Sequence, residues 1–144
     1  MFRVAPAART LAFVSAAALA VAGCEDSPTA AASLDGTYQA TTFRVTPTGQ
    51  AAVDVLAQGG SLTIVVARDN STTGTLSIPP SANGGSPFSA SMAGRVVGTG
   101  GTVTFEQTAD TFVRNLTWTV SGSTLQVTDQ AAGSARYTIT LARQ

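Results

Sequence analysis

The sequence predicts an all-β protein, an eight-stranded antiparallel up-and-down barrel within residues 34–144. Apolar and polar residues alternate with a period of two in short runs, which is the pattern of strands with one buried face. Threonine and valine, which favour strands, are abundant in these runs. Glycine, proline and asparagine separate the runs, and several of these separators have the composition of hairpin turns.

Eight runs carry the alternation. In "SLTIVVAR", for example, Leu62, Ile64 and Val66 fall on one face of the expected strand. No run is continuously apolar, as the strands of a parallel sheet are, so the sheet is predicted to be antiparallel. The predicted strands cover about residues 36–46, 61–68, 73–79, 88–97, 101–106, 115–121, 124–129 and 134–142.

Three links between the predicted strands are longer than simple turns. The segment "AAVDVLAQGG" (51–60) is predicted to form a short helix that ends at glycine. The segment "TADTFVRN" (108–115) is predicted to contain a second helical turn, in which Asp110 and Arg114 are spaced four residues apart. The segment "PSANGGSP" (80–87) is predicted to be a flexible loop.

The order of the strands favours a barrel. Sequential strands with short links fit a meander, and closing the meander removes its exposed edges. Each strand carries one apolar set, which is enough to line a single interior. A β-sandwich remains the alternative architecture, because periodicity alone does not separate the two.

The first 23 residues precede the predicted barrel and have the pattern of an export signal. The start of the chain is basic, with Arg3 and Arg9 and no acid. The next 13 residues, 11–23, carry no charge. A helix needs about 20 apolar residues to cross a membrane, so this run is too short to be a membrane anchor.

The apolar run ends in "VAGC", whose last residue, Cys24, is the only cysteine of the chain. This tetrapeptide resembles the lipobox of bacterial lipoproteins. The resemblance implies cleavage before Cys24 and acylation of this residue by chains such as palmitate. The alternative is ordinary Ala-x-Ala cleavage after residues 20–22, which would export an unpaired thiol. A lipidated Cys24 would tether the protein to a membrane of the cell envelope, outside the cytoplasm, with residues 24–33 as a flexible stalk.

Composition narrows the chemistry that the chain can perform. Without residues 1–23 the chain keeps six arginines and eight acids, so neither nucleic acid nor an anionic membrane surface is an expected partner. Histidine and lysine are absent, which removes the usual proton carrier and Schiff-base chemistry. We therefore expect a protein that is not an enzyme, has no cofactor and no metal site, and is a monomer.

The charged residues of the barrel give few candidate sites. Asp110, Arg114 and Glu106 form the densest cluster; a carboxylate there is a candidate general acid or base, but the favoured interpretation is a solvated turn with a weak ion pair. Three further acids are expected in turns or caps, where aspartate is common: Asp54, Asp69 and Asp129.

The start of the barrel carries a family resemblance. The run "LDGTYQATTF" (34–43) resembles the first-strand Gly-x-Trp signature of lipocalins, with Gly36 and Tyr38 in its two positions. Residues 34–142 are similar to small lipocalin-like bacterial lipoproteins. This resemblance implies a lipocalin-like barrel with a packed end, where Gly36 and Tyr38 lie near an arginine such as Arg136 or Arg143.

The aromatic side chains either line a ligand cavity or fill the core of a small barrel. The favoured interpretation is that they fill the core, because a body of this size has little core to spare. The candidates for barrel lining are Tyr38, Phe105, Trp118 and Tyr137, with Phe43, Phe88 and Phe112 as further members.

Three functions follow as expectations. The first is a binding or scaffold module at the cell envelope, which takes a small apolar ligand or an envelope protein at the barrel mouth. Small residues in "SPFSASMAGRVVG" (86–98) and the loop at 80–87 would open one end. The second is a purely structural lipoprotein with a filled barrel. The third is a carboxylate-dependent hydrolase, for which alternation points only Asp129 inward.

Overall fold

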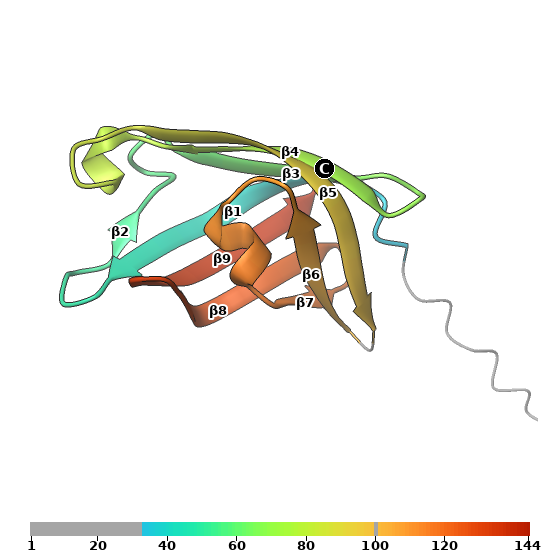
Figure 1. Cartoon of the computed structure of the whole chain (residues 1–144). Helices are drawn as coiled ribbons and strands as arrows, with labels where there is room; N and C mark the ends of the chain where they lie inside the picture. Colours follow the sequence, from blue (N-terminus) through green and yellow to red (C-terminus); the bar gives the residue numbers. More distant parts are fainter. Residues whose placement is uncertain (1–32, 100) are drawn as a thin grey trace, which may run out of the picture.

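The computed structural model describes residues 33–99 and 101–144. The predicted signal, Cys24 and most of the predicted stalk lie outside the described residues. Within the described part, the chain forms one antiparallel sheet that closes on itself (Figure 1).

Eight strands form the barrel, and each is hydrogen-bonded to the next barrel strand along the chain. The last strand pairs with the first along most of its length, from Tyr38↔Arg143 to Pro47↔Ala135, and this ladder closes the barrel. The all-β, eight-stranded, up-and-down prediction is confirmed, and the β-sandwich alternative is excluded. The barrel strands are β1 (Gly36–Pro47), β3 (Ser61–Val66), β4 (Ser71–Ile78), β5 (Phe88–Thr99), β6 (Thr102–Gln107), β7 (Trp118–Ser121), β8 (Thr124–Ala132) and β9 (Ala135–Arg143).

The two ends of the barrel are named by what they carry. The tail end is where β1 begins and β9 ends, so the start of the first strand and the C-terminus lie there (Figure 1). The mouth is the opposite end, where the chain leaves β1, passes from β4 to β5 and turns from β8 into β9. The β4–β5 link carries one turn of 3-10 helix, η1 (Pro80–Ala82).

Alternating residues of each strand point into the barrel and form its core. On β3, Leu62, Ile64 and Val66 are buried, as their spacing predicts. Burial of such side chains contributes about 1.5–3 kcal/mol each, so the core is the main source of stability. The largest wholly buried side chains are those of Trp118, Tyr38, Phe43, Phe105, Leu62, Ile64, Leu76, Met92, Leu116, Leu125, Ile139 and Leu141.

The segment between β6 and β7 completes the wall of the barrel. β5 pairs with β6 only from Gly94 to Thr99, which leaves the part of β5 nearer the mouth without this neighbour. Residues 108–117, which include the 3-10 turn η2 (Phe112–Asn115), run across the front of the barrel between β5 and β8 (Figure 1). Val113 and Leu116 of this segment are completely buried, so it serves as a packed part of the wall.

The helix predicted for residues 51–60 is wrong. This segment contains the two-residue strand β2 (Val53–Asp54), which pairs with Arg44 and Val45 of β1, followed by turns. The Val55 amide continues the contact by donating to the Phe43 carbonyl at 2.8 Å. β3 pairs with only the first part of β1, so the edge nearer the mouth is free to pair with β2. Tertiary pairing therefore overrides the local helix signal.

The second helical prediction is confirmed as a 3-10 turn at residues 112–115. Asp110 and Arg114 form the expected ion pair, with 2.7 Å between the carboxylate Oδ1 and Nη2. Both side chains are substantially exposed, so this pair contributes little to stability.

Gly94 of β5 does not open the barrel interior, which is the role expected for the small residues of this strand. A Cβ at Gly94 would lie 1.9 Å from the Glu106 carbonyl oxygen and 2.9 Å from the Gln107 Cα. The backbone of β6 therefore occupies the space that a side chain at Gly94 would need. This glycine lets two strands approach closely and closes the tail half of the barrel.

Candidate functional site: the barrel mouth

The four aromatic residues predicted to line the barrel divide between two environments. Tyr38, Phe105 and Trp118 are buried. The Phe105 and Trp118 rings meet edge to face, with centroids 5.7 Å apart and planes at 80°, which is a favoured aromatic geometry. Tyr137 is only partly buried and belongs to the mouth.

The tail end is fixed by Arg143 of β9. Its Nη2 and Nε donate to the Tyr38 hydroxyl at 2.9 and 3.2 Å, and its guanidinium lies 5.4 Å from the centre of the Tyr38 ring. Nη2 also donates to the Ser33 carbonyl. Gly36 leaves room for this arginine, since a Cβ there would lie 3.1 Å from Arg143 Cδ. Of the two arginines considered, Arg143 thus takes the packed end.

Arg136, the other candidate, lies on the outside of the barrel. Its Nε donates to Asp129 Oδ1 at 2.7 Å and its Nη2 to Oδ2 at 2.8 Å. The expectation that Asp129 points inward is wrong, because a bulge in β8 between Val127 and Gln130 interrupts the alternation. Asp129 has φ +49° and an exposed side chain, and Gln130 takes the position next to the interior.

The mouth holds a pocket of about 420 Å³. This volume lies in the range of small-molecule sites, roughly 300–1,000 Å³. The pocket is formed by the ends of β1, β4 and β9 together with the links around them. Its lining residues are Val45, Pro47, Gln50, Val53, Ile78, Ser81, Ala82, Asn83, Gly84, Ser134, Ala135 and Tyr137.

Tyr137 has the largest side chain of the pocket. Its ring stacks on Phe112 of η2, with centroids 4.1 Å apart and planes at 13°, and Phe112 in turn contacts Phe43 at 5.9 Å. Burial raises the pKa of the Tyr137 hydroxyl. No side-chain hydrogen bond joins this hydroxyl to another described residue, so a neutral donor is available at the mouth.

Hydrogen bonds hold the loops that surround the mouth. The amide and hydroxyl of Thr48 both donate to the Ser134 carbonyl, at 2.9 and 2.8 Å, and join the first loop to the β8–β9 turn. Within the β4–β5 link, Asn83 Nδ2 donates to the Ser86 carbonyl at 2.9 Å. These bonds limit the movement of the rim, and a preformed rim reduces the entropy lost on binding.

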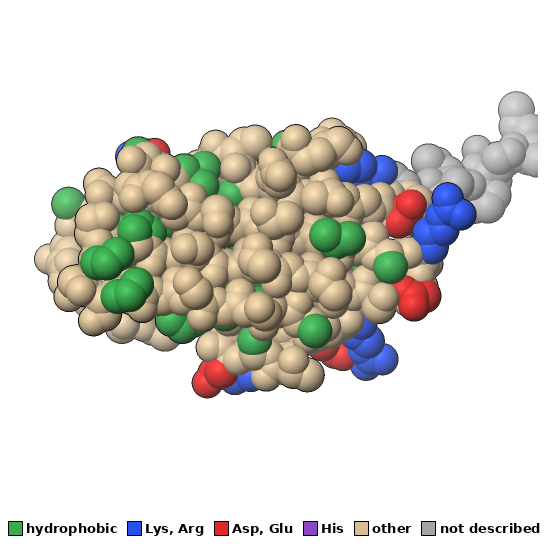
Figure 2. All heavy atoms as spheres, turned by 90° about the horizontal axis from the view of Figure 1, so that it is seen from above, with side chains coloured by type: hydrophobic (Ala, Val, Ile, Leu, Met, Phe, Trp, Pro, Cys, Tyr) green, Lys and Arg blue, Asp and Glu red, His purple; other side chains and the backbone are tan. Residues whose placement is uncertain are grey.

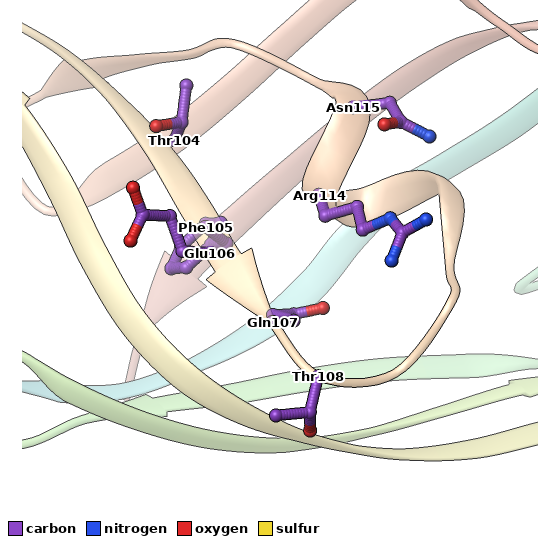
Figure 3. A pocket seen from close by; sticks show the side chains of 7 residues that line it. All are labelled: Thr104, Phe105, Glu106, Gln107, Thr108, Arg114 and Asn115. Carbon is purple, nitrogen blue, oxygen red and sulfur yellow. The ribbon is translucent and has the colours of Figure 1, made fainter.

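A second hollow lies outside the barrel, between β6 and η2, and measures about 470 Å³. Glu106 and Arg114 lie on opposite sides of it (Figure 3). Glu106 accepts from Arg95 Nε at 2.6 Å, and Arg114 pairs with Asp110. The charged groups of the predicted cluster are thus ion-paired and exposed.

The remaining predicted acids take part in turns. Asp54 accepts from the Ala57 amide at 3.1 Å, and Asp69 accepts from the amide and hydroxyl of Ser71 at 3.0 and 2.6 Å. Both agree with the structural roles predicted for them. In residues 33–99 and 101–144, no three His, Cys, Asp or Glu side chains are grouped as metal ligands.

Sequence reasoning identified part of the mouth. The sequence indicates the loop at 80–87 as part of the mouth and Tyr137 only as barrel lining. It gives no signal for Val45, Gln50 or Ser134, which come from separate parts of the chain. Comparison with protein-family models, curated proteins and solved structures yields no match. Among the described residues, no helix has the length and apolar character needed to cross a membrane.

Proposed function

We propose that this protein is a lipid-anchored protein of the bacterial cell envelope whose barrel mouth binds a small apolar ligand. The pocket of about 420 Å³ carries this proposal. Val45, Ile78 and Ala135 give it apolar walls, and the hydrogen bonds of Thr48 and Asn83 hold its rim. Mouths of β-barrels are a common place for such sites.

The described chain begins at the end of the barrel opposite the proposed site. The first strand begins at Gly36 at the tail end, opposite the loops of the mouth (Figure 1). Residues of these loops line the pocket. A lipid on Cys24 would therefore hold the tail end toward the membrane and leave the mouth open to the surroundings. This arrangement suits a receptor for a ligand that arrives from the aqueous phase.

The mature N-terminus tests the anchor. Mass spectrometry of protein isolated from its own host is expected to give a chain that begins at an acylated Cys24. A Cys24→Ala variant is expected to leave the membrane fraction. An unmodified chain that begins at Gly23 would contradict the anchor.

Ligand uptake tests the site. Native mass spectrometry of the purified protein is expected to reveal a bound small molecule, and N-phenyl-1-naphthylamine, a neutral apolar fluorophore, is expected to bind saturably. Ala82 lines the pocket, so Ala82→Trp should block the pocket and lower the affinity for the fluorophore at least about tenfold. Ala93→Trp, at an exposed position of β5, is the matched control and should bind normally. Equal binding by both variants would contradict a site in the mouth.

A purely structural role is the second candidate. The packing of Phe105 against Trp118, and of Tyr38 against Arg143, fills the tail half of the barrel and favours this role. A structural protein would carry no ligand from its host and would take up no fluorophore. The two experiments on uptake therefore separate the candidates.

A further inference from the structure

We propose that the mouth selects an uncharged amphiphile, which has an apolar body and a neutral hydroxyl, carbonyl or amide head, and that it rejects the same body with an ionic head. This inference rests on the proposed binding function. It adds the chemical class of the ligand, which a pocket volume alone does not give.

The first argument is the charge of the pocket. None of its lining residues is an Arg, Asp or Glu. Nearby charges lie outside the barrel: Arg136 adjoins Tyr137 in sequence but is paired with Asp129 on the outer face, and Arg44 stands opposite Asp54 in the β1–β2 pair. An ionic head in the mouth would lose water and gain no opposite charge, which costs several kcal/mol.

The second argument is the set of neutral polar groups. Gln50, Ser81, Asn83 and Ser134 line the pocket beside its apolar walls. The Tyr137 hydroxyl adds a group that can donate and accept, and because burial raises its pKa it stays protonated at neutral pH. These groups satisfy a neutral head by hydrogen bonds and supply nothing that compensates a full charge.

The third argument is the aromatic side of the pocket. Tyr137 lines the pocket, and its ring stacks on Phe112, which in turn contacts the buried Phe43. A ligand therefore meets aromatic surface within the pocket and cannot pass through the barrel. The site suits a short chain or a single ring system, about the size of the pocket itself.

The test is a comparison of three octyl compounds, 1-octanol, octanoate and octylammonium, by amide NMR titration at neutral pH and below their micellar concentrations. 1-Octanol is expected to shift the amides around Val45, Ile78 and Tyr137, and the two ions are expected to bind at least about tenfold more weakly. Octanoate or octylammonium binding at the mouth as tightly as octanol would overturn the inference but leave the binding function. Failure of all three to shift these amides would overturn both.

A charged variant sharpens the test. Ser81 is exposed on the rim, so Ser81→Arg should fold and should place a cation at the pocket. Octanoate is then expected to gain about tenfold in affinity relative to 1-octanol. Ser81→Gln is the neutral control of similar length and should keep the preference of the original protein. If Ser81→Arg bound octanoate no more tightly than the original protein, the lack of a positive charge in the pocket would not be the reason that octanoate is rejected.

Discussion

The two ends of this barrel are built from the same strands but differ in chemistry. At the tail end, Arg143 is bonded to Tyr38 and packed over its ring. At the mouth, Tyr137, two residues after the start of β9, stacks on Phe112 and lines a pocket that has no charged residue. Many of the charged side chains visible from above gather near the tail end (Figure 2). Arg143 thus closes the tail end of the barrel, whereas Tyr137 leaves a pocket at the mouth.

The largest effect is expected where the closed half is tightest. Gly94→Ala would place a methyl group against the Glu106 carbonyl and should lower the free energy of unfolding by about 3 kcal/mol. Ala135→Val adds two methyl groups at the mouth, where they meet the pocket, and should change stability by less than about 0.5 kcal/mol. Urea unfolding of both variants measures the difference. Equal losses would contradict the contrast between the two halves.

The next effect concerns the arginine that closes the tail end. Arg143→Met keeps most of the side-chain length but removes the hydrogen bonds to the Tyr38 hydroxyl and the Ser33 carbonyl, so stability should fall by about 2 kcal/mol. Arg68→Met is the control, because Arg68 is almost fully exposed and lies 3.8 Å from Asp35. Its loss should be below about 0.5 kcal/mol. Thermal unfolding with calorimetry checks both values, and a harmless Arg143→Met would show that packing alone closes this end.

A smaller effect of opposite sign is expected inside the closed half. The buried Thr72 hydroxyl has no hydrogen-bond partner among the described residues. Thr72→Val should therefore raise the free energy of unfolding by about 1 kcal/mol, because it removes a desolvated polar group and keeps the shape. Thr73→Val, on the exposed face of the same strand, controls for strand propensity. Equal gains in both variants would mean that burial of the hydroxyl costs nothing.

The smallest effects are expected from pH, and they differ between the ends. Near the tail end, hydrogen bonds from the Ser71 hydroxyl and amide lower the pKa of Asp69 below its ordinary 3.8. The contribution of these bonds to folding stability is therefore present above pH 3.8 and is lost as the pH falls. At the mouth, burial raises the pKa of Tyr137 above 10.0. The contribution of the protonated Tyr137 side chain to folding stability is therefore present below pH 10.0 and is lost as the pH rises.

Midpoints of urea unfolding measured from pH 2 to 11 test whether the contributions of Asp69 and Tyr137 change with pH in opposite directions. Asp69→Asn should flatten the acid side of the profile, and Tyr137→Phe should flatten the alkaline side. An unchanged alkaline side in Tyr137→Phe would show that the mouth does not protect this hydroxyl from ionisation.

The barrel was predictable from the sequence because a period of two in eight runs records which side chains are buried. The spacing of Leu62, Ile64 and Val66, for example, predicts their burial even when the strands they pair with are unknown. The segment around Val53 was not predictable in the same way, since its strand exists only through pairing with Val45 of β1. Alternation also failed at Asp129, where the bulge inserts a residue and reverses the faces.

The candidate site was predictable only in part. Tyr137 and the loop at 80–87 have local signals, an aromatic in a strand and a proline–glycine composition. The pocket itself requires Val45, Ile78 and Ala135 to meet, and these residues are brought together only when the barrel closes. The absence of charge in the pocket is likewise a property of the assembled mouth.

The start of β1 and the end of β9 lie side by side, which has a mechanical consequence. The Gln144 amide still donates to the Thr37 carbonyl at 2.9 Å, so the last residue is bonded beside the first strand. Force applied between Gly36 and Gln144 would peel β9 from β1 one rung at a time. Force between the tail and a partner held at the mouth would instead act along the strands, and the whole ladder from Tyr38↔Arg143 to Pro47↔Ala135 would resist it together. The barrel is therefore strongest against force along its strands, which is the direction in which the proposed tether would pull it.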